Sequence, residues 1–320
     1  MRYKRLGKTD LEISVIGFGS GPLGNLYGDI DTQTGVNAVH AAIDKGVNFF
    51  DTAYYYGPKL SETRLGEALK GRRDKVLIAT KGGRYDFDEF DFTEKRLFEA
   101  VEESLQRLQT DYIDLYQLHD IEFDKTSIVL EEGLPALEKL REQGKIRYIG
   151  ITGYPPHLLR DVALQHPVDS VLSYCHYNLL NTTLNEVLVP TVKEQGIGLI
   201  NASVLHMGVL TDNGSQDWHP APQKVHDAGK QIAALAREHG SNITNLAIQF
   251  ALQNENVDST LIGMRTVEEV EHNLALLDTE IDTELLAKIQ EIIAPVKDIN
   301  WESGLPEHHE PDAQPWRDLS

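Results

Sequence analysis

Four polar residues in this chain could together move a proton at a carbonyl or carbinol group. Asp51, Lys81 and His119 each follow a short apolar run, and Tyr56 lies five residues beyond Asp51. A phenol with an ordinary pKa of about 10 is a poor acid or base near neutral pH. A neighbouring ammonium favours the phenolate, so we expect Lys81 to lower the pKa of Tyr56.

The other two residues complete this mechanism. An unpaired buried charge is costly, so Asp51 would hold the Lys81 ammonium in place and offset its burial. His119 would form a hydrogen bond with the reacting oxygen and fix its position relative to Tyr56. Each residue alone also has an ordinary structural explanation, as a loop cap, a solvated strand end or a core histidine. Together they predict proton transfer.

A regular repeat of elements would bring these residues together. Short apolar, β-rich runs alternate with amphipathic helical patterns along nearly the whole chain, which is typical of a (β/α)8 TIM barrel of the α/β class. The active site of such a barrel lies where the strands end, which is where the four residues fall. A doubly wound sheet is the alternative. The eight runs are 14–19, 48–53, 75–80, 112–118, 146–152, 169–175, 196–202 and 259–264.

Several segments extend this repeat. Two polar/apolar alternations within 2–14 predict an N-terminal β-hairpin that closes the bottom of the barrel. A long loop rich in Gly, Pro, Asn and Asp, 204–223, follows the seventh run, and extra helices lie in the C-terminal part. Long loops in compact domains are commonly functional. We expect one domain over 1–320, with a flexible acidic tail at 304–320.

Composition excludes several classes of protein. The 30 Lys and Arg against 50 Asp and Glu give a net charge of −20, which disfavours nucleic acid and anionic membranes as partners. A single cysteine, Cys175, excludes an internal disulfide, and no histidines have metal-ligand spacing, so we expect no metal. With no long apolar run or signal peptide, we expect a cytoplasmic monomer or small homo-oligomer.

The motifs around the four residues resemble those of the aldo-keto reductases, whose DxxxxYG, strand-end lysine and strand-end histidine match DTAYYYG, ATKGGRY and LHDIEF here. In that family a hydride passes between nicotinamide C4 and a substrate carbon while the tyrosine moves the proton. The resemblance implies these roles for Asp51, Tyr56, Lys81 and His119. Further segments, including GRYDFDEFDF, LSYCHY and PVKDINWESG, resemble the subgroup of L-galactose and L-fucose (D-threo-aldose) 1-dehydrogenases, which oxidise a free sugar to the lactone.

The same resemblance implies where a nicotinamide cofactor binds. The glycine-rich run 17–24 is a poor Rossmann fingerprint because Pro22 replaces the third glycine, so we expect its glycines to allow close backbone approach. Thr152 and Tyr174 depart from the usual residues of the nicotinamide site. The candidate cofactor residues are Gly19, Thr152, Tyr174, Ser203, Leu205, Gly208, Gly263, Met264, Arg265, Glu269 and Asn273.

Charge in the adenosine segment discriminates between the two nicotinamide cofactors. Arg265 is its one basic residue, whereas Glu269 would repel the 2′-phosphate of NADP. We therefore expect NAD, with NADP less favoured. A plain helix start, with Thr266 as N-cap and Glu269 completing a capping box, is compatible with this assignment.

A sugar substrate needs flat aromatic faces and polar groups for its hydroxyls. The functional alternatives that we weigh are an NADPH-dependent reductase of small aldehydes or ketones, a pyridoxal dehydrogenase, and a regulatory subunit that binds the nucleotide without turnover. The candidate substrate residues on loops at the expected face are Leu23, Tyr55, Tyr85, Asp120, His176, Trp218 and Trp301.

Overall fold

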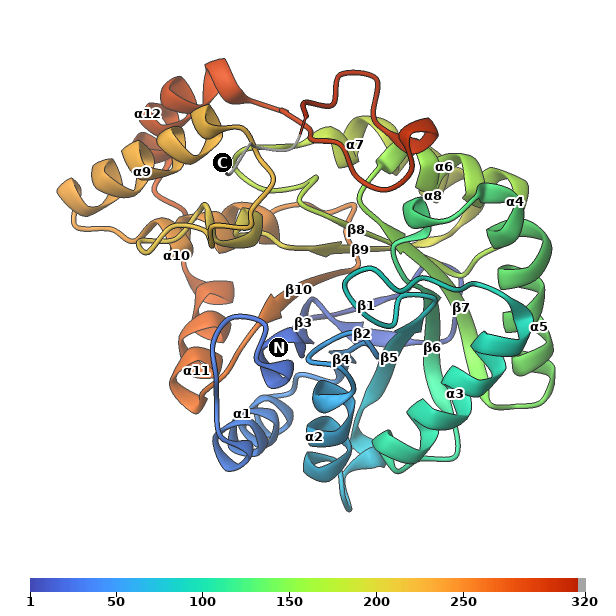
Figure 1. Cartoon of the computed structure of the whole chain (residues 1–320). Coiled ribbons are helices and arrows are strands. Elements are labelled where there is room, and N and C mark those ends of the chain that lie inside the picture. The colour runs from blue at the N-terminus through green and yellow to red at the C-terminus, as the bar shows by residue number, and fades with distance from the viewer. Residues whose placement is uncertain (316–320) are drawn as a thin grey trace.

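Eight parallel strands form a closed barrel in the computed structural model, which describes residues 1–315 (Figure 1). The last barrel strand pairs with both the first and its own predecessor, which closes the sheet. The predicted TIM barrel is therefore confirmed, and a doubly wound open sheet is wrong. The strands are β3 (Ile16–Gly19), β4 (Phe49–Asp51), β5 (Leu77–Gly82), β6 (Ile113–Leu118), β7 (Ile146–Gly153), β8 (Ser170–Tyr174), β9 (Gly198–Ala202) and β10 (Ser259–Gly263).

Helices surround the barrel, and two of them, α9 and α12, lie together at one side (Figure 1). The longest helices are amphipathic and bury their apolar stripe. The helices are α1 (Thr32–Asp44), α2 (Leu60–Ala68), α3 (Glu94–Leu108), α4 (Thr126–Ile128), α5 (Leu134–Glu142), α6 (Pro156–Gln165), α7 (Thr183–Val187), α8 (Val189–Gln195), α9 (Gln223–Glu238), α10 (Ile243–Leu252), α11 (Val267–Ala275) and α12 (Thr283–Ile293).

The predicted N-terminal hairpin closes the bottom of the barrel. It consists of β1 (Tyr3–Arg5) and β2 (Glu12–Ser14), which pair antiparallel. The hairpin side chain of Leu6 is buried in the same apolar cluster as the barrel residues Leu115 and Ile200. Hairpin backbone bonds also reach the loop that precedes β9. The end of the barrel at which the strands begin is therefore filled with apolar side chains.

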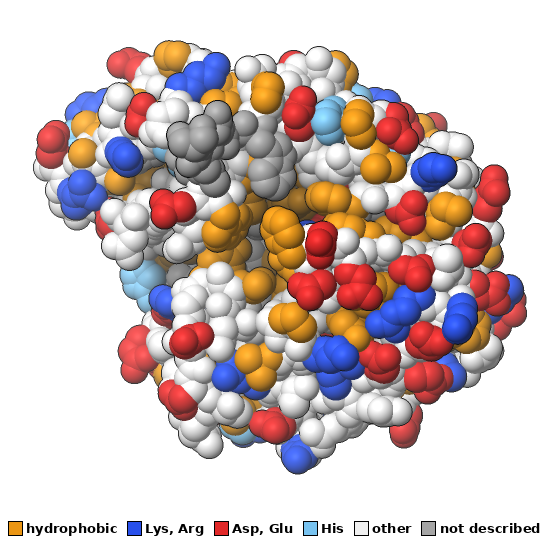
Figure 2. Space-filling view, in the orientation of Figure 1, with side chains coloured by type: hydrophobic (Ala, Val, Ile, Leu, Met, Phe, Trp, Pro, Cys, Tyr) orange, Lys and Arg blue, Asp and Glu red, His pale blue; other side chains and the backbone are white. Residues whose placement is uncertain are grey.

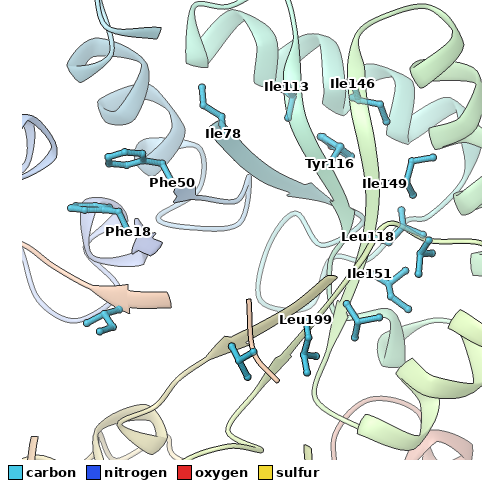
Figure 3. Packing of buried hydrophobic residues seen from close by; sticks show 14 of the residues in the cluster. Phe18, Phe50, Ile78, Ile113, Tyr116, Leu118, Ile146, Ile149, Ile151 and Leu199 are labelled. Carbon is cyan, nitrogen blue, oxygen red and sulfur yellow. The ribbon is translucent and has the colours of Figure 1, made fainter. Parts of the chain in front are cut away.

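Alternation along each strand separates an inner from an outer apolar layer. On β5, Ala79 belongs to the inner cluster, whereas Ile78 packs outward toward the helices. Figure 3 shows part of the outer layer, including Phe18 and Phe50, whose ring centroids lie 5.2 Å apart. Lys81 lies two residues after Ala79, so its side chain is on the same inner face of β5, at the open end of the barrel.

The C-terminal segment packs against the barrel top. Leu305 donates its backbone N–H to the carbonyl of Glu122 at 2.8 Å, and the buried Glu310 carboxylate binds His157. Residues 304–315 of the expected flexible tail thus make buried polar contacts with the barrel, and 316–320 lie outside the described residues. No helix within 1–315 is long and apolar enough to cross a membrane.

A buried ion pair fixes α2 and α3 on the outside of β5. Glu62 on α2 is fully buried, and its two carboxylate oxygens accept from Thr80 Oγ1 at 2.6 Å and from Arg107 Nε at 2.7 Å. Every charged or polar atom of this contact has a partner, which compensates for the cost of burying the carboxylate.

Removing one partner should therefore be strongly destabilising. We expect Arg107→Met to lower the free energy of unfolding by about 3 kcal/mol, because it leaves the Glu62 charge buried and unpaired. Arg72→Met, which removes the solvent-exposed pair with Asp44, should change the free energy of unfolding little. Urea unfolding of the two variants measures both values, and equal losses would contradict a structural role for the buried pair.

Candidate active site

A buried ion pair lies at the centre of the open end of the barrel. Lys81 Nζ donates to Asp51 Oδ1 and to the carbonyl of Thr52 at 2.7 Å, and both charged side chains are 2% exposed. The pair forms because β4 and β5 are adjacent, with Asp51 in register with Ala79. Burial raises the pKa of Asp51 above its ordinary value, although the Lys81 ammonium opposes this.

The carboxylate has a second partner that the sequence reasoning missed. Gln117 Nε2 donates to Asp51 Oδ2 at 3.1 Å, and both side chains are buried. Gln117 lies on the inner face of β6, two residues before His119, which directly follows the end of that strand, so both side chains point to the same side of the sheet. That spacing was the signal that could have identified Gln117 as part of the site.

Tyr56 is brought to the ion pair by a tight loop. Its Oη lies 3.4 Å from Lys81 Nζ. The next residue, Gly57, has a φ of 61°, and a Cβ there would lie 2.0 Å from the carbonyl oxygen of Gly24. Because only glycine fits such an approach in this conformation, the Tyr-Gly dipeptide lets the loop sit close enough for the phenol to reach Lys81.

The pKa of Tyr56 differs from our expectation. Enclosure by protein, together with the negative charges of Asp51 and Asp120, raises the pKa of Tyr56 well above its ordinary value. The predicted lowering of the Tyr56 pKa by Lys81 is wrong for this structure, because burial of the phenol outweighs it and the Asp51 carboxylate neutralises the neighbouring ammonium. Tyr56 is therefore a protonated phenol at neutral pH.

His119 stands beside the tyrosine as a neutral imidazole. The two ring centroids lie 5.8 Å apart, edge to face. Burial lowers the pKa of His119 to about 3, although the adjacent Asp120 opposes this. Its Nδ1 is buried with no hydrogen-bond partner among the described residues. A neutral ring can donate or accept a hydrogen bond at a substrate oxygen without carrying charge.

A cavity of about 840 Å³ opens next to these side chains and is lined by Asp51 and Tyr56. Figure 2 shows hydrophobic side chains gathered in the middle of one face of the molecule, with acidic side chains beside them. The cavity runs toward α11 and takes its walls mainly from the segments after β3, β9 and β10. Eight of the candidate cofactor residues line it: Gly19, Ser203, Leu205, Gly208, Gly263, Arg265, Glu269 and Asn273.

Comparison with known proteins identifies the family. The aldo/keto reductase family model matches residues 15–294. The chain belongs to the aldo/keto reductase family. It is 42% identical over 316 residues to L-galactose dehydrogenase of Arabidopsis thaliana, covering 95% of this chain and 98% of the plant enzyme. It is 31% identical over 310 residues to D-threo-aldose 1-dehydrogenase of a Pseudomonas species, covering 88% and 94% of the two chains.

A solved structure agrees with this assignment. The holo form of an aldo-keto reductase from Bacillus halodurans superposes with a TM-score of 0.77 at 28% identity, over 97% of this chain and all of the other. In this aldo/keto reductase a phenol, an ammonium, a carboxylate and a neutral imidazole thus lie together at the open end of the barrel.

Arg265 is engaged by its own helix. Glu269 accepts from the Arg265 side chain at 2.6 and 3.0 Å and from the Arg265 backbone N–H at 2.7 Å. Thr266 caps α11 by accepting from the Glu269 backbone N–H at 3.2 Å, as predicted. The predicted capping box is not completed, because the Glu269 carboxylate accepts from the backbone N–H of Arg265 and not from that of Thr266. The one arginine of the adenosine segment is therefore already paired with a carboxylate at the cavity wall.

Three candidate cofactor residues do not line the cavity. Met264 is fully buried in the apolar layer behind β10. Thr152 is buried, and its Oγ1 accepts from the backbone N–H of Asp120 at 3.2 Å. Tyr174 packs against Tyr154, with ring centroids 5.6 Å apart. In the described structure these three residues support neighbouring side chains.

Two candidate substrate residues lie next to His119. The Tyr55 ring lies 6.2 Å from His119, measured between centroids. Asp120 Oδ1 lies 3.8 Å from His119 Nε2. Trp218 is 47% exposed on the long loop after β9, away from these contacts. Tyr55 and Asp120 are thus the predicted substrate residues that the fold places beside His119.

The other four candidates are buried in packing contacts. Leu23 has no exposed surface and lies in the outer apolar layer. Tyr85 packs edge-on against Tyr54, at 5.0 Å between ring centroids. His176 and Trp301 both pack against Tyr154, each at 4.5 Å between centroids. Their placement does not support the predicted substrate contacts, because neighbouring side chains cover the surface that a sugar would need.

Several cavity residues had no recognisable signal in the sequence. Tyr27, on the loop between β3 and α1, lines the cavity, as do residues at the start of α10 and two on α11. These segments reach the cavity only because the barrel closes. Within 1–315, no three His, Cys, Asp or Glu side chains group as metal ligands would. The residues at the start of α10 and on α11 are Asn242, Thr244, Asn245, Glu268 and His272.

The neutral state of His119 predicts a particular pH dependence of stability. Below its ordinary pKa of about 6.5, the unfolded chain binds a proton at His119, whereas the folded chain does not until about pH 3. The free energy of unfolding therefore falls as the pH falls through this window, by about 1.4 kcal/mol per pH unit for this group. We expect His119→Gln to remove that much of the slope between about pH 5.5 and 4.5.

Urea unfolding across this pH window is the measurement. His239→Gln, at an exposed position at the end of α9, controls for the substitution itself and should keep the wild-type slope. A His119→Gln variant with the same slope as the wild type would contradict a neutral buried imidazole.

Proposed function

We propose that this aldo/keto reductase oxidises a free aldose at C1 to the lactone, with NAD as the hydride acceptor and L-galactose, L-fucose or a stereochemically related sugar as the substrate. The observation that carries the proposal is the meeting of Tyr56 Oη, Lys81 Nζ and the His119 ring beside the cavity. Support for a sugar comes from similarity along nearly the whole chain to L-galactose dehydrogenase and D-threo-aldose 1-dehydrogenase.

The cavity fits a nicotinamide dinucleotide. Gly19 and Gly263 are paired in register at the ends of β3 and β10, and both line the cavity, so no side chain rises from this part of the floor. Gly208, with a φ of 101°, turns the opposite wall. Ser203 adds a polar side chain along the same wall. When bound, the nicotinamide ring would accept a hydride at its C4 beside Tyr56.

The protein groups handle the proton of the reacting hydroxyl. The Tyr56 phenol first releases its proton to solvent. As the C1–H bond then gives up its hydride, the C1 hydroxyl proton passes to the Tyr56 phenolate oxygen, and the C1–O bond becomes the lactone carbonyl. Lys81 stabilises the phenolate that has to form, and the Asp51–Lys81 pair fixes that ammonium 3.4 Å from the phenol. The neutral His119 forms a hydrogen bond with the same oxygen and keeps it aligned with Tyr56.

Tyr56→Phe tests the proton-transfer role. We expect kcat for aldose oxidation to fall by about 10²- to 10⁴-fold, because the proton acceptor is gone while the cavity is intact. NADH formation measures kcat, and fluorescence titration of NADH should show unchanged cofactor affinity. Tyr148→Phe is the matched control, since that phenol binds Asp10 at the bottom of the barrel and should keep full activity. Undiminished turnover by Tyr56→Phe would overturn the mechanism.

The panel of substrates also distinguishes the alternatives. Wild-type protein is assayed with NAD and NADP against L-galactose, L-fucose, D-arabinose, L-glucose, D-galactose and pyridoxal. Rapid NADH formation with one L-sugar supports the proposal. If no sugar is oxidised but simple aldehydes are reduced with NADPH, the reductase alternative is supported. Tight nucleotide binding without any turnover supports a regulatory role.

The preference for NAD rests on Glu269. Its carboxylate pairs with Arg265 at the cavity wall, so a 2′-phosphate near them would meet a negative charge and an arginine that is already engaged. NAD has no such phosphate and meets no like charge. Discrimination of this kind arises from repulsion of the wrong ligand as much as from attraction of the right one.

Glu269→Gln should shift this preference. We expect the ratio of kcat/KM for NADP to that for NAD to rise by about tenfold, because the like charge disappears and Arg265 is released. Glu271→Gln on the same helix is the matched control, since Glu271 pairs with Lys45 on the outside at 3.1 Å and should leave the ratio unchanged. An unchanged ratio in Glu269→Gln would contradict this origin of the preference.

A further inference from the structure

Arg84 connects three parts of the molecule beside the catalytic histidine. Its Nη1 donates to Asp120 Oδ2 at 2.5 Å, and its guanidinium carbon lies 4.0 Å from the centre of the Tyr55 ring. Its remaining nitrogens reach the carbonyls of Asp86 and Phe87 at 3.5 and 3.4 Å. The Arg84 side chain is 14% exposed, so these contacts are largely enclosed. One arginine thus holds the loop after β5, Tyr55 and Asp120 in fixed positions.

The Asp120 backbone is held in a conformation that the residue rarely adopts. Asp120 has a φ of 56°, and its N–H donates to Thr152 Oγ1 at 3.2 Å. Non-glycine residues in this region are strained and persist where surrounding contacts impose them, most often at functional sites. The strained turn directs the carboxylate back toward His119, which precedes it in the chain.

The second oxygen of this carboxylate has no hydrogen-bond partner among the described residues. Oδ2 is taken by Arg84, whereas Oδ1 accepts no hydrogen bond from the described residues and lies 3.8 Å from His119 Nε2. The side chains of His119 and Asp120 are almost equally enclosed, at 6% and 5% exposed. Because Oδ1 lies so close to His119 Nε2, a substrate oxygen that binds Nε2 would place its neighbouring group within reach of Asp120.

The chemistry of a pyranose limits what that neighbouring group is. C1 has two ring neighbours, the ring oxygen and C2. An ionised carboxylate only accepts hydrogen bonds, and the ring oxygen has no hydrogen to donate. The C2 hydroxyl does, and a hydrogen bond from it to a charged acceptor is stronger than one between neutral groups.

We propose that Asp120, positioned by Arg84, accepts a hydrogen bond from the hydroxyl on the carbon next to the reacting carbon, and so selects 2-hydroxy aldoses over substrates that lack this group. This inference rests on the proposed function and names the substrate group, the C2 hydroxyl, that the same site recognises. Arg84 acts through Asp120 and is a positioning residue. A site built to bind a substrate hydroxyl rejects the analogue that lacks it by a large factor, because its buried acceptor is left unpaired.

The test compares the best aldose with its 2-deoxy counterpart. We expect wild-type protein to prefer the 2-hydroxy sugar by about 10²-fold or more in kcat/KM. Asp120→Asn should reduce this preference at least about tenfold, since the neutral amide is a weaker acceptor. Comparing the two sugars within each variant cancels any loss of activity that affects both equally.

Arg84→Lys tests the positioning role. Lysine keeps the positive charge but lacks the planar fork that binds Asp120 while stacking on Tyr55. We expect the preference for the 2-hydroxy sugar to fall between the values of wild type and Asp120→Asn, and KM for that sugar to rise more than kcat falls. If Asp120→Asn fails to fold, this variant alone decides the proposal. Asp44→Asn, in the surface pair with Arg72, is the control that should keep the full preference.

The outcomes separate this inference from the proposed function. Wild-type protein that oxidises no aldose overturns both. Wild-type protein that oxidises the aldose, with an Asp120→Asn variant that retains the full preference over the 2-deoxy sugar, overturns the role of Asp120 and leaves the dehydrogenase proposal standing. Loss of the preference in both variants, with thermal midpoints close to that of the control, supports the inference.

Discussion

The buried pair of Lys81 and Asp51 constrains everything at the open end of this barrel. Two charges removed from water are tolerable only when each also has further hydrogen-bond partners. The Thr52 carbonyl and the Gln117 amide supply them, from the loop after β4 and from the neighbouring strand β6. Because those partners are satisfied, the ammonium has one further direction left, toward Tyr56, and the geometry of the site follows from that.

The barrel makes this arrangement possible by stacking a polar layer on an apolar one. Below the ion pair, inner side chains such as Ala79 and Leu115 fill the barrel, and the hairpin residue Leu6 closes its lower end. Because the strands are parallel and in register, the next inward-facing residues of neighbouring strands lie in one layer above these apolar side chains. Chemistry is thereby confined to the open end, where a substrate can enter.

Backbone strain is concentrated along the cavity wall after β9. Ser203, His206 and Met207 all have φ values between 48° and 55°, and Gly208 follows at 101°. Residues other than glycine rarely adopt such φ values, and clusters of them usually mark functional loops. Here the four left-handed residues turn the chain sharply, so that Ser203 and Gly208 both face the cavity.

The sequence by itself determined the barrel, the closing hairpin and the gathering of Asp51, Tyr56, Lys81 and His119. These follow from local periodicity and from the rule that parallel strands end at one face, both of which are readable along the chain. The burial of Leu23 and Tyr85, and the docking of 304–315 on the barrel, depended instead on partners distant in the sequence.

The protonation state of Tyr56 was also decided by tertiary structure. The sequence indicated an ammonium near the phenol, but only the folded chain shows that Asp51 neutralises it and that enclosure by protein disfavours the phenolate. The contact between Arg84 and Asp120, which are 36 residues apart, is of the same kind. Charge, burial and hydrogen bonding depend on distances of a few ångströms between segments that no local pattern relates, and that is why the three-dimensional packing was needed to establish them.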